Sequence, residues 1–188
     1  MRQPIILMGP IGAGKSTVGR LLAAALDLPI CHVDEVRWGY YEQLGYDRAL
    51  ADQIAAEQGL IAMLRYCEPF DVAMLEQLLV DHSGIIDLGA SNSVYEDEAL
   101  LCRAEAALAP VPYVILLLPS ADPNASGAIL KERLIQMLTA TGQSYSDELF
   151  SLNDYLLRQP ANGRLAKQIV YTSGKQPDEI CAEIVLLG

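Results

Sequence analysis

The sequence predicts an α/β fold in which a parallel sheet carries helices on both of its faces. Short apolar runs alternate along the chain with longer segments whose apolar residues recur at helical spacing. Several of the short runs are apolar at successive positions, which is typical of strands covered on both faces. Strands and helices in this alternation form parallel sheets through right-handed crossovers.

Five short apolar runs are the predicted strands: Ile5–Met8, Pro29–Val33, Gly84–Leu88, Tyr113–Leu118 and Gln168–Tyr171. Between them, two segments carry a clear apolar stripe at helical spacing, Lys15–Leu26 and Phe70–Val80. Both are predicted helices.

Three further helix starts carry capping signals, at Ser93–Glu96, Asp122-Pro123 and Pro177. The first has the spacing of a capping box, and the other two place proline at the first helical position. They predict helices that run towards Ala107, over Pro123–Leu138 and close to the end of the sequence.

The size and composition predict one domain over residues 1–188. Of the 188 residues, 52% are hydrophobic and 20% are charged, which is enough for a sizeable core. The formal net charge of -11 argues against nucleic acid or an anionic membrane as a partner. Any phosphate ligand must therefore be held by a local positive field in an acidic molecule.

Cysteine usage and hydropathy predict a cytoplasmic protein. The four cysteines form no C-x-x-C pair and no cluster with histidine, so we expect reduced thiols. No stretch approaches the ~20 apolar residues that a membrane span needs, and Ile5–Met8 is too short for a signal-peptide core. We expect a monomer or a weak homodimer.

The segment Gly9–Thr17 fits the P-loop pattern G-x-x-x-x-G-K-[ST] at every fixed position. It follows a predicted strand and opens a predicted helix, as the pattern requires. Lys15 is expected to reach the β- and γ-phosphates of a nucleotide, and the Ser16 hydroxyl is expected to ligate Mg²⁺. A glycine-rich turn without a ligand would require neither side chain. The predicted nucleotide contacts in this segment are Gly9, Gly12, Ala13, Gly14, Lys15, Ser16 and Thr17.

The stretch 5–35 (IILMGPIGAGKSTVGRLLAAALDLPICHVDE) resembles shikimate kinase, including Gly19-Arg20 and a short second strand that ends at an aspartate. Weaker matches follow at Arg65-Tyr66-Cys67-Glu68, 85–90, Arg158-Gln159-Pro160 and Ser173–Pro177. The resemblance implies a three-layer P-loop NTPase fold with a five-stranded parallel sheet in the order 2-3-1-4-5. It also implies ATP and Mg²⁺ as cofactors, acceptor-side helices over about 35–82 and a lid over about 136–150.

The sequence departs from the family pattern at three places. The family's Asp-x-Asp is His32-Val33-Asp34 here, so the first carboxylate is missing. The triple glycine is reduced to Leu88-Gly89-Ala90, and no Arg-Pro-Leu-Leu lid element occurs between 136 and 150. Asp87 ends an apolar strand, where its carboxylate can support Mg²⁺ in place of the missing one. The small polar stretch Thr139–Ser146 is predicted to be a mobile loop.

Two residues are candidates for the acceptor and the metal. Asp34 is expected to orient or deprotonate an acceptor hydroxyl, with helix capping as the alternative. Asp87 is expected to support Mg²⁺ rather than to cap a helix.

The remaining candidates follow from the resemblance and from charge. Arg65 is expected to clamp an anionic group of the acceptor, or else to pair with Glu68. Arg158 is expected to place positive charge on the phosphoryl group or acceptor, or else to be a solvated helix end. Gly89 is a predicted acceptor contact. Arg133 is expected to stack on adenine, and Pro177 to contact adenine or only to begin a helix.

These residues predict an ATP-dependent phosphotransferase that acts on a hydroxyl of a small, anionic acceptor. Two alternatives stay open. One is a regulatory P-loop nucleotide-binding protein or ATPase with weak or no kinase activity. The other is the same fold with another acceptor, such as a nucleotide, a sugar acid or an aminoglycoside-like compound.

Overall fold

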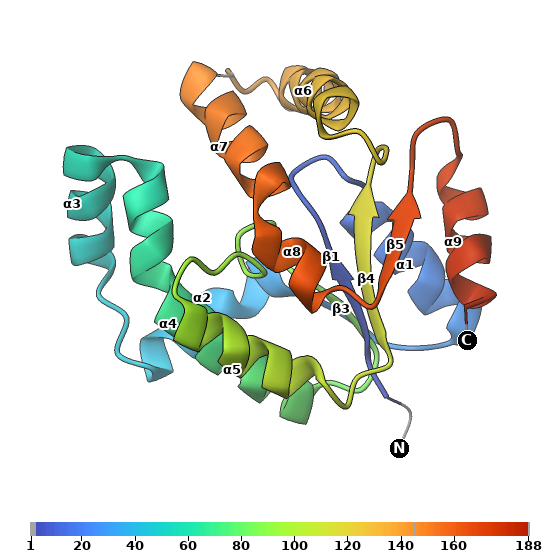
Figure 1. Cartoon of the computed structure of the whole chain (residues 1–188), viewed down its shortest axis with the longest axis horizontal. Helices are drawn as coiled ribbons and strands as arrows, with labels where there is room; N and C mark the ends of the chain where they lie inside the picture. The colour runs from blue at the N-terminus through green and yellow to red at the C-terminus, as the bar shows by residue number, and fades with distance from the viewer. Residues whose placement is uncertain (1–2, 145, 188) are drawn as a thin grey trace.

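The computed structural model describes residues 3–144 and 146–187, and its centre is a five-stranded parallel sheet (Figure 1). The strands lie in the order β2-β3-β1-β4-β5, which confirms the predicted order. Their bounds are β1 Ile5–Met8, β2 Ile30–His32, β3 Ile85–Asp87, β4 Tyr113–Leu118 and β5 Gln168–Tyr171. The bounds of β1, β4 and β5 agree with the prediction, and β2 and β3 are each one residue shorter at each end than predicted.

Helices lie on both faces of the sheet, as predicted. Their bounds are α1 Lys15–Leu26, α2 Val33–Gln43, α3 Arg48–Gln58, α4 Leu60–Asp81, α5 Glu98–Leu108, α6 Pro123–Ala140, α7 Asp147–Arg158, α8 Pro160–Leu165 and α9 Pro177–Val185. Within the described residues, no helix combines the length and the hydrophobicity needed to cross a bilayer.

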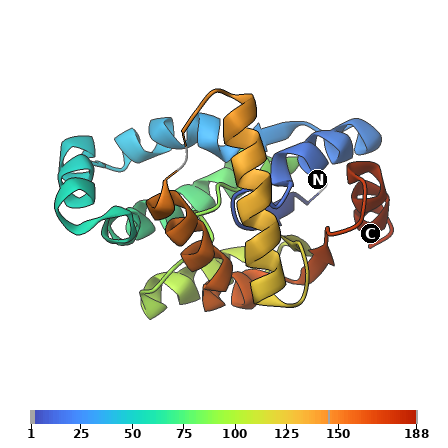
Figure 2. The same ribbon diagram turned by 90° about the horizontal axis from the view of Figure 1, so that it is seen from above.

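The two sheet faces bury two separate cores because side chains alternate along each strand. Ile6 and Met8 of β1 face a core formed with α2, α4, α5 and α8. Ile5 and Leu7 face the other way, into a core formed mainly with α1 and α9. The arrowheads of β4 and β5 point towards α6 in Figure 1, and Figure 2 shows this helix crossing the molecule above the strands. Helix α6 therefore lies over the carboxyl-terminal edge of the sheet. This is the edge at which open α/β sheets bind ligands.

Helix α4 is longer than the predicted helix, because it begins at Leu60 and continues through Pro69. Proline lacks an N–H and removes one hydrogen bond from the helix ladder, so it marks a break in a sequence pattern. Here Cys67 on one side of Pro69 and Val72 on the other are buried in the same core, and this packing favours a continuous helix.

The predicted capping box at Ser93–Glu96 is wrong, because the N-cap of α5 lies four residues after Ser93. This N-cap is Asp97, whose Oδ1 accepts hydrogen bonds from the amides of Ala99 and Leu100 at 2.8 and 3.1 Å. Ser93 is buried and donates instead to Asn162 Oδ1 at 2.8 Å. A hydroxyl with a buried tertiary partner is not available as a cap.

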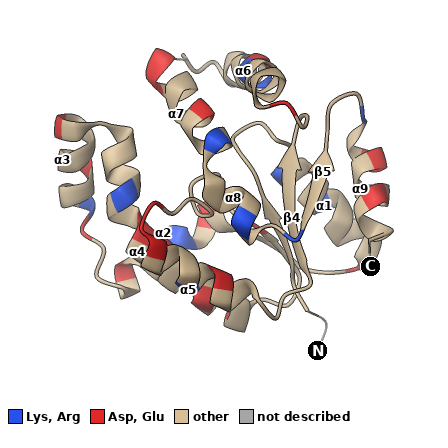
Figure 3. Ribbon diagram, viewed as in Figure 1, with Lys and Arg blue, Asp and Glu red and all other residues tan. Residues whose placement is uncertain are grey.

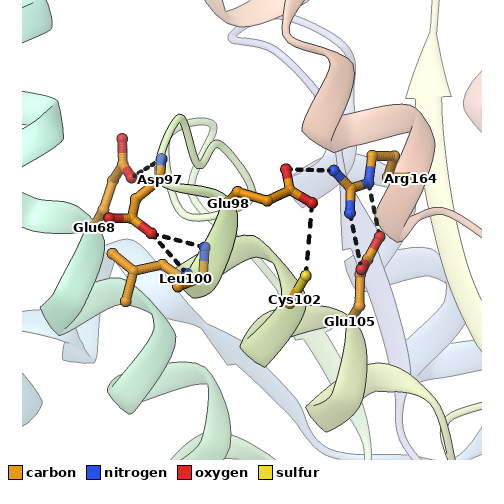
Figure 4. Close-up of polar contacts among 8 residues, drawn as sticks. Glu68, Asp97, Glu98, Leu100, Cys102, Glu105 and Arg164 are labelled. Atoms are coloured by element: carbon orange, nitrogen blue, oxygen red, sulfur yellow. Dashed lines mark hydrogen bonds and ion pairs between the residues drawn. The ribbon is translucent and has the colours of Figure 1, made fainter.

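The start of α5 is also fixed by its neighbours (Figure 4). Glu68 of α4 accepts a hydrogen bond from the Asp97 amide at 3.1 Å. Arg164 of α8 donates to Glu98 and Glu105 of α5, each at 2.8 Å for the closest pair of atoms. These contacts join three helices on one face of the sheet.

The other two predicted helix starts are confirmed. Asp122 caps α6 by accepting from the Asn124 amide at 2.9 Å. Pro177 is at the start of α9, where Gln176 and Glu179 form a capping box. Helix α6 continues to Ala140, into the stretch predicted to be a mobile loop. Within that stretch, Tyr145 lies outside the described residues.

Candidate active site

A hollow of about 740 Å³ lies at the carboxyl-terminal edge of the sheet, beside the P-loop. Its lining comes from the P-loop, α1, α2, α4, the segment after β3, α6 and α7. Four cations line it: Lys15, Arg20, Arg37 and Arg133. Figure 3 shows acidic residues on α4, α5, α7 and α9. The hollow thus gathers positive charge in a molecule with a formal net charge of -11.

The P-loop backbone has the shape that its glycines allow. Gly9, Gly12 and Gly14 have φ of 144°, 82° and 100°, in the region that side chains disfavour. A Cβ on Gly9 would also lie 2.5 Å from the carbonyl oxygen of Leu117 in β4. Gly14 is the N-cap of α1, so the loop leads directly into the positive end of this helix.

Lys15 is the first residue of α1, and its side chain is buried. Its Nζ donates to the carbonyl oxygens of Gly9 at 2.8 Å and Pro10 at 3.2 Å. Burial lowers the pKa of Lys15, while the nearby carboxylates of Asp87 and Asp34 act in the opposite direction. The ammonium is therefore held against the loop and lies within the field of both predicted carboxylates.

The two predicted carboxylates differ in exposure. Asp87 ends β3 and is buried, and its Oδ2 lies 2.8 Å from Nδ1 of His32. Asp34 is in the first turn of α2, and its side chain is 71% exposed and lines the hollow. The N-cap position of α2 belongs to His32, so the capping alternative for Asp34 is wrong. One carboxylate is thus buried beside a histidine, and the other is exposed in the hollow.

Gly89 lies against Asp34, because a Cβ at this glycine would be 2.6 Å from Asp34 Oδ1. A side chain there would displace the carboxylate. Residues Ala90 and Ser91, which follow it, line the hollow. The structure therefore brings together Lys15, Asp34 and Asp87, with Gly89 beside them.

Comparison with known proteins finds shikimate kinases, although no protein-family model matches the chain. Shikimate kinase of Thioalkalivibrio sulfidiphilus is 41% identical over 99 residues, which are 53% of this chain and 47% of that protein. Shikimate kinase of Rhodococcus jostii is 34% identical over 96 residues, 51% of each protein. These matches span about half the length of the two curated relatives.

Two solved structures share the fold along almost the whole chain. Shikimate kinase from Acinetobacter baumannii, in complex with shikimate, has a TM-score of 0.64 at 17% identity. The alignment covers 100% of this chain and 93% of the Acinetobacter chain. The fold of this chain is that of a shikimate kinase. A gluconokinase from Sinorhizobium meliloti has a TM-score of 0.63 at 19% identity, with coverage of 99% and 92%. The shared fold is thus common to kinases named for different acceptors.

Two of the predicted arginines lie outside the hollow of this shikimate kinase-like fold. Arg65 is exposed, and its Nε donates to Glu96 Oε2 at 2.5 Å. Arg158 donates to Asp154 at 2.8 Å and to Asn124 at 3.0 Å. It lines a separate hollow of about 470 Å³ between α6 and α7. The structure therefore does not bring either guanidinium to Lys15 and Asp34.

Arg65 also lacks the alternative partner that the sequence suggested. Glu68 is buried and accepts from the backbone amides of Glu96 and Asp97, both at 3.1 Å. The carboxylate of Glu68 thus organises the loop before α5, and the ion pair of Arg65 is made with Glu96 instead.

The two predicted adenine contacts have different positions. Arg133 of α6 lines the hollow, and its Nη1 donates to the Gly12 carbonyl oxygen and to Thr172 Oγ1, both at 3.2 Å. Pro177 is exposed at the start of α9 and is not among the lining residues. The structure thus places Arg133 against the P-loop, and Pro177 at a helix start.

A contact between α7 and the P-loop was not predicted from the sequence. Asn153 is buried, and its Oδ1 accepts from the Ile11 amide at 2.8 Å. Its Nδ2 donates to the Ile11 carbonyl oxygen at 3.0 Å. One side chain therefore satisfies both backbone groups of a P-loop residue. Only the fold brings these positions together, since 142 residues separate them in the sequence.

Arg37, which lines the hollow from α2, was likewise not predicted as a site residue. Its Cζ lies 4.4 Å from the centroid of the Trp38 ring, and its Nη1 lies 3.9 Å from Asp34 Oδ1. The spacing of three residues from Asp34 was a usable signal, because residues three apart share a helix face. The segment was not predicted as a helix with defined bounds, so the sequence did not place Arg37 beside Asp34.

Proposed function

We propose that this chain is an ATP-dependent kinase that transfers the γ-phosphoryl group to a hydroxyl of a small, anionic acceptor. The observation that carries the proposal is one hollow that holds the P-loop lysine, Lys15, and an exposed carboxylate, Asp34. A P-loop alone supports nucleotide binding. An exposed carboxylate in the same hollow supports a second substrate with a hydroxyl to activate.

The nucleotide side of the proposal rests on the P-loop. Its backbone amides, the N-terminal end of α1 and Lys15 suit the β- and γ-phosphates. Arg133, which already contacts the Gly12 carbonyl and lines the hollow, is placed to contact the nucleotide. Phosphoryl transfer depends mainly on positioning and on neutralising charge, and this set of groups supplies both.

The residues present also fit Mg²⁺. The Ser16 hydroxyl and the Asp87 carboxylate are oxygen donors, which this ion prefers, and it takes its other ligands from phosphate and water. Bound Mg²⁺ would neutralise charge on the transferring group. Within the described part of the chain, no three His, Cys, Asp or Glu side chains form a cluster that could hold a metal by themselves. This agrees with an ion that is held largely by the nucleotide.

Asp34 is the proposed acceptor-side base. The acceptor oxygen bonds to the γ-phosphorus of ATP while the bond from that phosphorus to the β,γ-bridging oxygen breaks. The proton of the acceptor hydroxyl passes to the Asp34 carboxylate. Lys15 offsets the negative charge that develops on the phosphates.

The relatives support this class of reaction, since they are named as kinases of small molecules. Shikimate and gluconate are both hydroxy acids, which supports a hydroxyl-bearing anionic acceptor here. We further propose that the protein is cytoplasmic and acts as a monomer or weak homodimer.

The test is ADP formation from ATP and Mg²⁺ with a panel of acceptors: shikimate, D-gluconate, a nucleoside monophosphate and an aminoglycoside. The kinase proposal predicts that at least one acceptor stimulates ADP release above the rate without acceptor. Equal ADP release with every compound would contradict it and favour a regulatory nucleotide-binding protein or ATPase.

A further inference from the structure

Arg37 places a positive charge beside the proposed base. It follows Asp34 by one turn of α2, and both line the same hollow. Its side chain is 27% exposed, and its Nη1 lies 3.9 Å from Asp34 Oδ1. A ligand group bound to this guanidinium would therefore lie within a few ångströms of the carboxylate.

The guanidinium of Arg37 has donors to offer. Its Nε is buried and, in the part of the chain that the structure describes, has no hydrogen-bond partner. The 3.9 Å to Asp34 is an ion pair beyond hydrogen-bonding distance. A buried donor without a partner is costly, so such groups usually have one. The planar fork of a guanidinium suits the two oxygens of a carboxylate.

Aromatic packing holds Arg37 in this position. Its Cζ lies 4.4 Å from the ring centroid of Trp38, which also lines the hollow. The Trp38 ring in turn packs against Tyr41 and Tyr46, with centroids 5.7 and 5.8 Å away. The guanidinium therefore packs on an aromatic ring that is itself held by neighbouring aromatic side chains. Binding a ligand group then costs little further ordering of the Arg37 side chain.

We propose that Arg37 binds the carboxylate of the acceptor, and that the acceptor is consequently a hydroxy acid whose reacting hydroxyl meets Asp34. This inference rests on the proposed kinase function. A single guanidinium matches the single charge of a carboxylate. A phosphate dianion would bring two negative charges close to the Asp34 carboxylate, whereas a carboxylate brings one. Arg37 thus takes the role that the sequence suggested for Arg65 and Arg158.

Trp38 provides the measurement, because it is the only tryptophan in the chain. The full chain, without nucleotide, is titrated with D-gluconate and shikimate while tryptophan fluorescence is recorded. D-Glucitol and methyl shikimate are the uncharged counterparts, and D-glucose 6-phosphate is the phosphate counterpart. We expect a saturable change with at least one hydroxy acid, and a Kd at least about tenfold weaker for its uncharged counterpart.

Substitutions at two arginines near Trp38 test whether hydroxy-acid binding depends on the Arg37 guanidinium itself. Arg37→Gln should weaken hydroxy-acid binding at least about tenfold, and Arg37→Lys should restore it only in part because lysine lacks the fork. Arg48→Gln is the matched control. The Arg48 guanidinium lies 5.4 Å from the same ring, but Arg48 does not line the hollow. This control should keep the affinity of the unchanged chain.

Three results would overturn the inference: hydroxy-acid binding unchanged in a folded Arg37→Gln variant, a response to the sugar phosphate alone, or no response to either hydroxy acid. The kinase function is tested separately by calorimetry with ATP and Mg²⁺ and by ADP formation. ADP formation only with acceptors that lack a carboxylate would leave the kinase proposal standing and remove this one. Absence of ATP binding, together with an Arg37-dependent response to a hydroxy acid, would retain the carboxylate site and remove the kinase.

Discussion

Nδ1 of His32 lies 2.8 Å from Oδ2 of Asp87, and the two residues are paired in register on neighbouring strands β2 and β3. In the sequence, His32 stands where the family pattern has a carboxylate, and Asp87 ends the next strand of the sheet. The histidine therefore gives the buried Asp87 carboxylate a partner and directs it. This pairing gives a defined structural role to His32, which in the sequence only marked the loss of a family carboxylate.

The pairing predicts that His32 positions Asp87. His32→Leu would leave the buried carboxylate without this partner and should lower the free energy of unfolding by about 1–3 kcal/mol. It should also raise the Mg²⁺ concentration needed for half-maximal ADP formation, because the carboxylate is no longer directed. His32→Asn, which can still donate, should recover part of both effects. Chemical unfolding and Mg²⁺ titration measure them, and an unchanged Mg²⁺ requirement in His32→Leu would refute the positioning role.

Lys15→Met should fold and lose turnover. Removing one positioned donor that stabilises charge at a transition state typically costs about 10²–10³ in rate. The fold should persist, since burial of Lys15 lowers its pKa and so disfavours its charged form in the native state. ADP formation and circular dichroism check the two parts. The control is Lys175→Met, which removes an exposed ammonium paired with Glu183. Full turnover in Lys15→Met would contradict the catalytic role.

Asn153→Leu should weaken ATP binding by about tenfold or more. The substitution removes both hydrogen bonds to Ile11 and leaves the P-loop backbone with two unsatisfied groups, at a cost of about 1–3 kcal/mol each if they stay buried. Isothermal titration with ATP and Mg²⁺ measures the change. Asn124→Ala, which removes a contact to Arg158 outside the P-loop hollow, should bind ATP normally. Equal affinity of the two variants would show that the α7 contact does not order the loop.

The buried Asp71 carboxyl predicts a pH dependence of stability. Burial raises its pKa to about 7, against the hydrogen bonds from Tyr41 and Asn92, which lower it. Between about pH 4 and pH 7 the folded chain holds a proton that the unfolded chain releases. Stability should therefore fall as pH rises through this window, by at most about 1.4 kcal/mol per pH unit from this group.

Asp71→Asn should remove that component of the slope, whereas Asp52→Asn, at an exposed position of α3, should retain it. Urea unfolding at several pH values measures the slopes. A slope that is the same in Asp71→Asn and in the unchanged chain would show that Asp71 does not hold the proton.

Strands and the P-loop could be predicted from the sequence because their signals are local. Every predicted strand is present, and α1 begins and ends where the pattern placed it. The N-cap of α7 is Ser146, which accepts from the Leu149 amide at 3.2 Å. It lies in the polar stretch 139–146, which was predicted to be a loop and gave no sign of a helix start. The bounds of α7 were therefore not predicted, although the alternative for Arg158, a solvated helix end, is confirmed, since Arg158 is the exposed last residue of α7. Its pairing with Asp154, four residues earlier, is a contact that a predicted helix would have indicated.

Residues of the candidate site could be predicted only where they lie at the end of a strand or in the P-loop. Lys15, Asp34 and Asp87 each follow or end a strand, and the parallel sheet brings such positions to one edge. Asn153 and Ile11 meet through tertiary packing, and no local pattern links them. Arg65 resembled a family position, but its orientation depends on Glu96, which lies in a loop that the sequence presented as the start of a helix.

The most direct test of the central claim is isothermal titration of the full chain with ATP in the presence of Mg²⁺, alongside Lys15→Met. We expect a saturable heat with one nucleotide bound per chain, and much weaker binding in the variant. Absence of binding heat for the folded, unchanged chain with either ATP or GTP would contradict it.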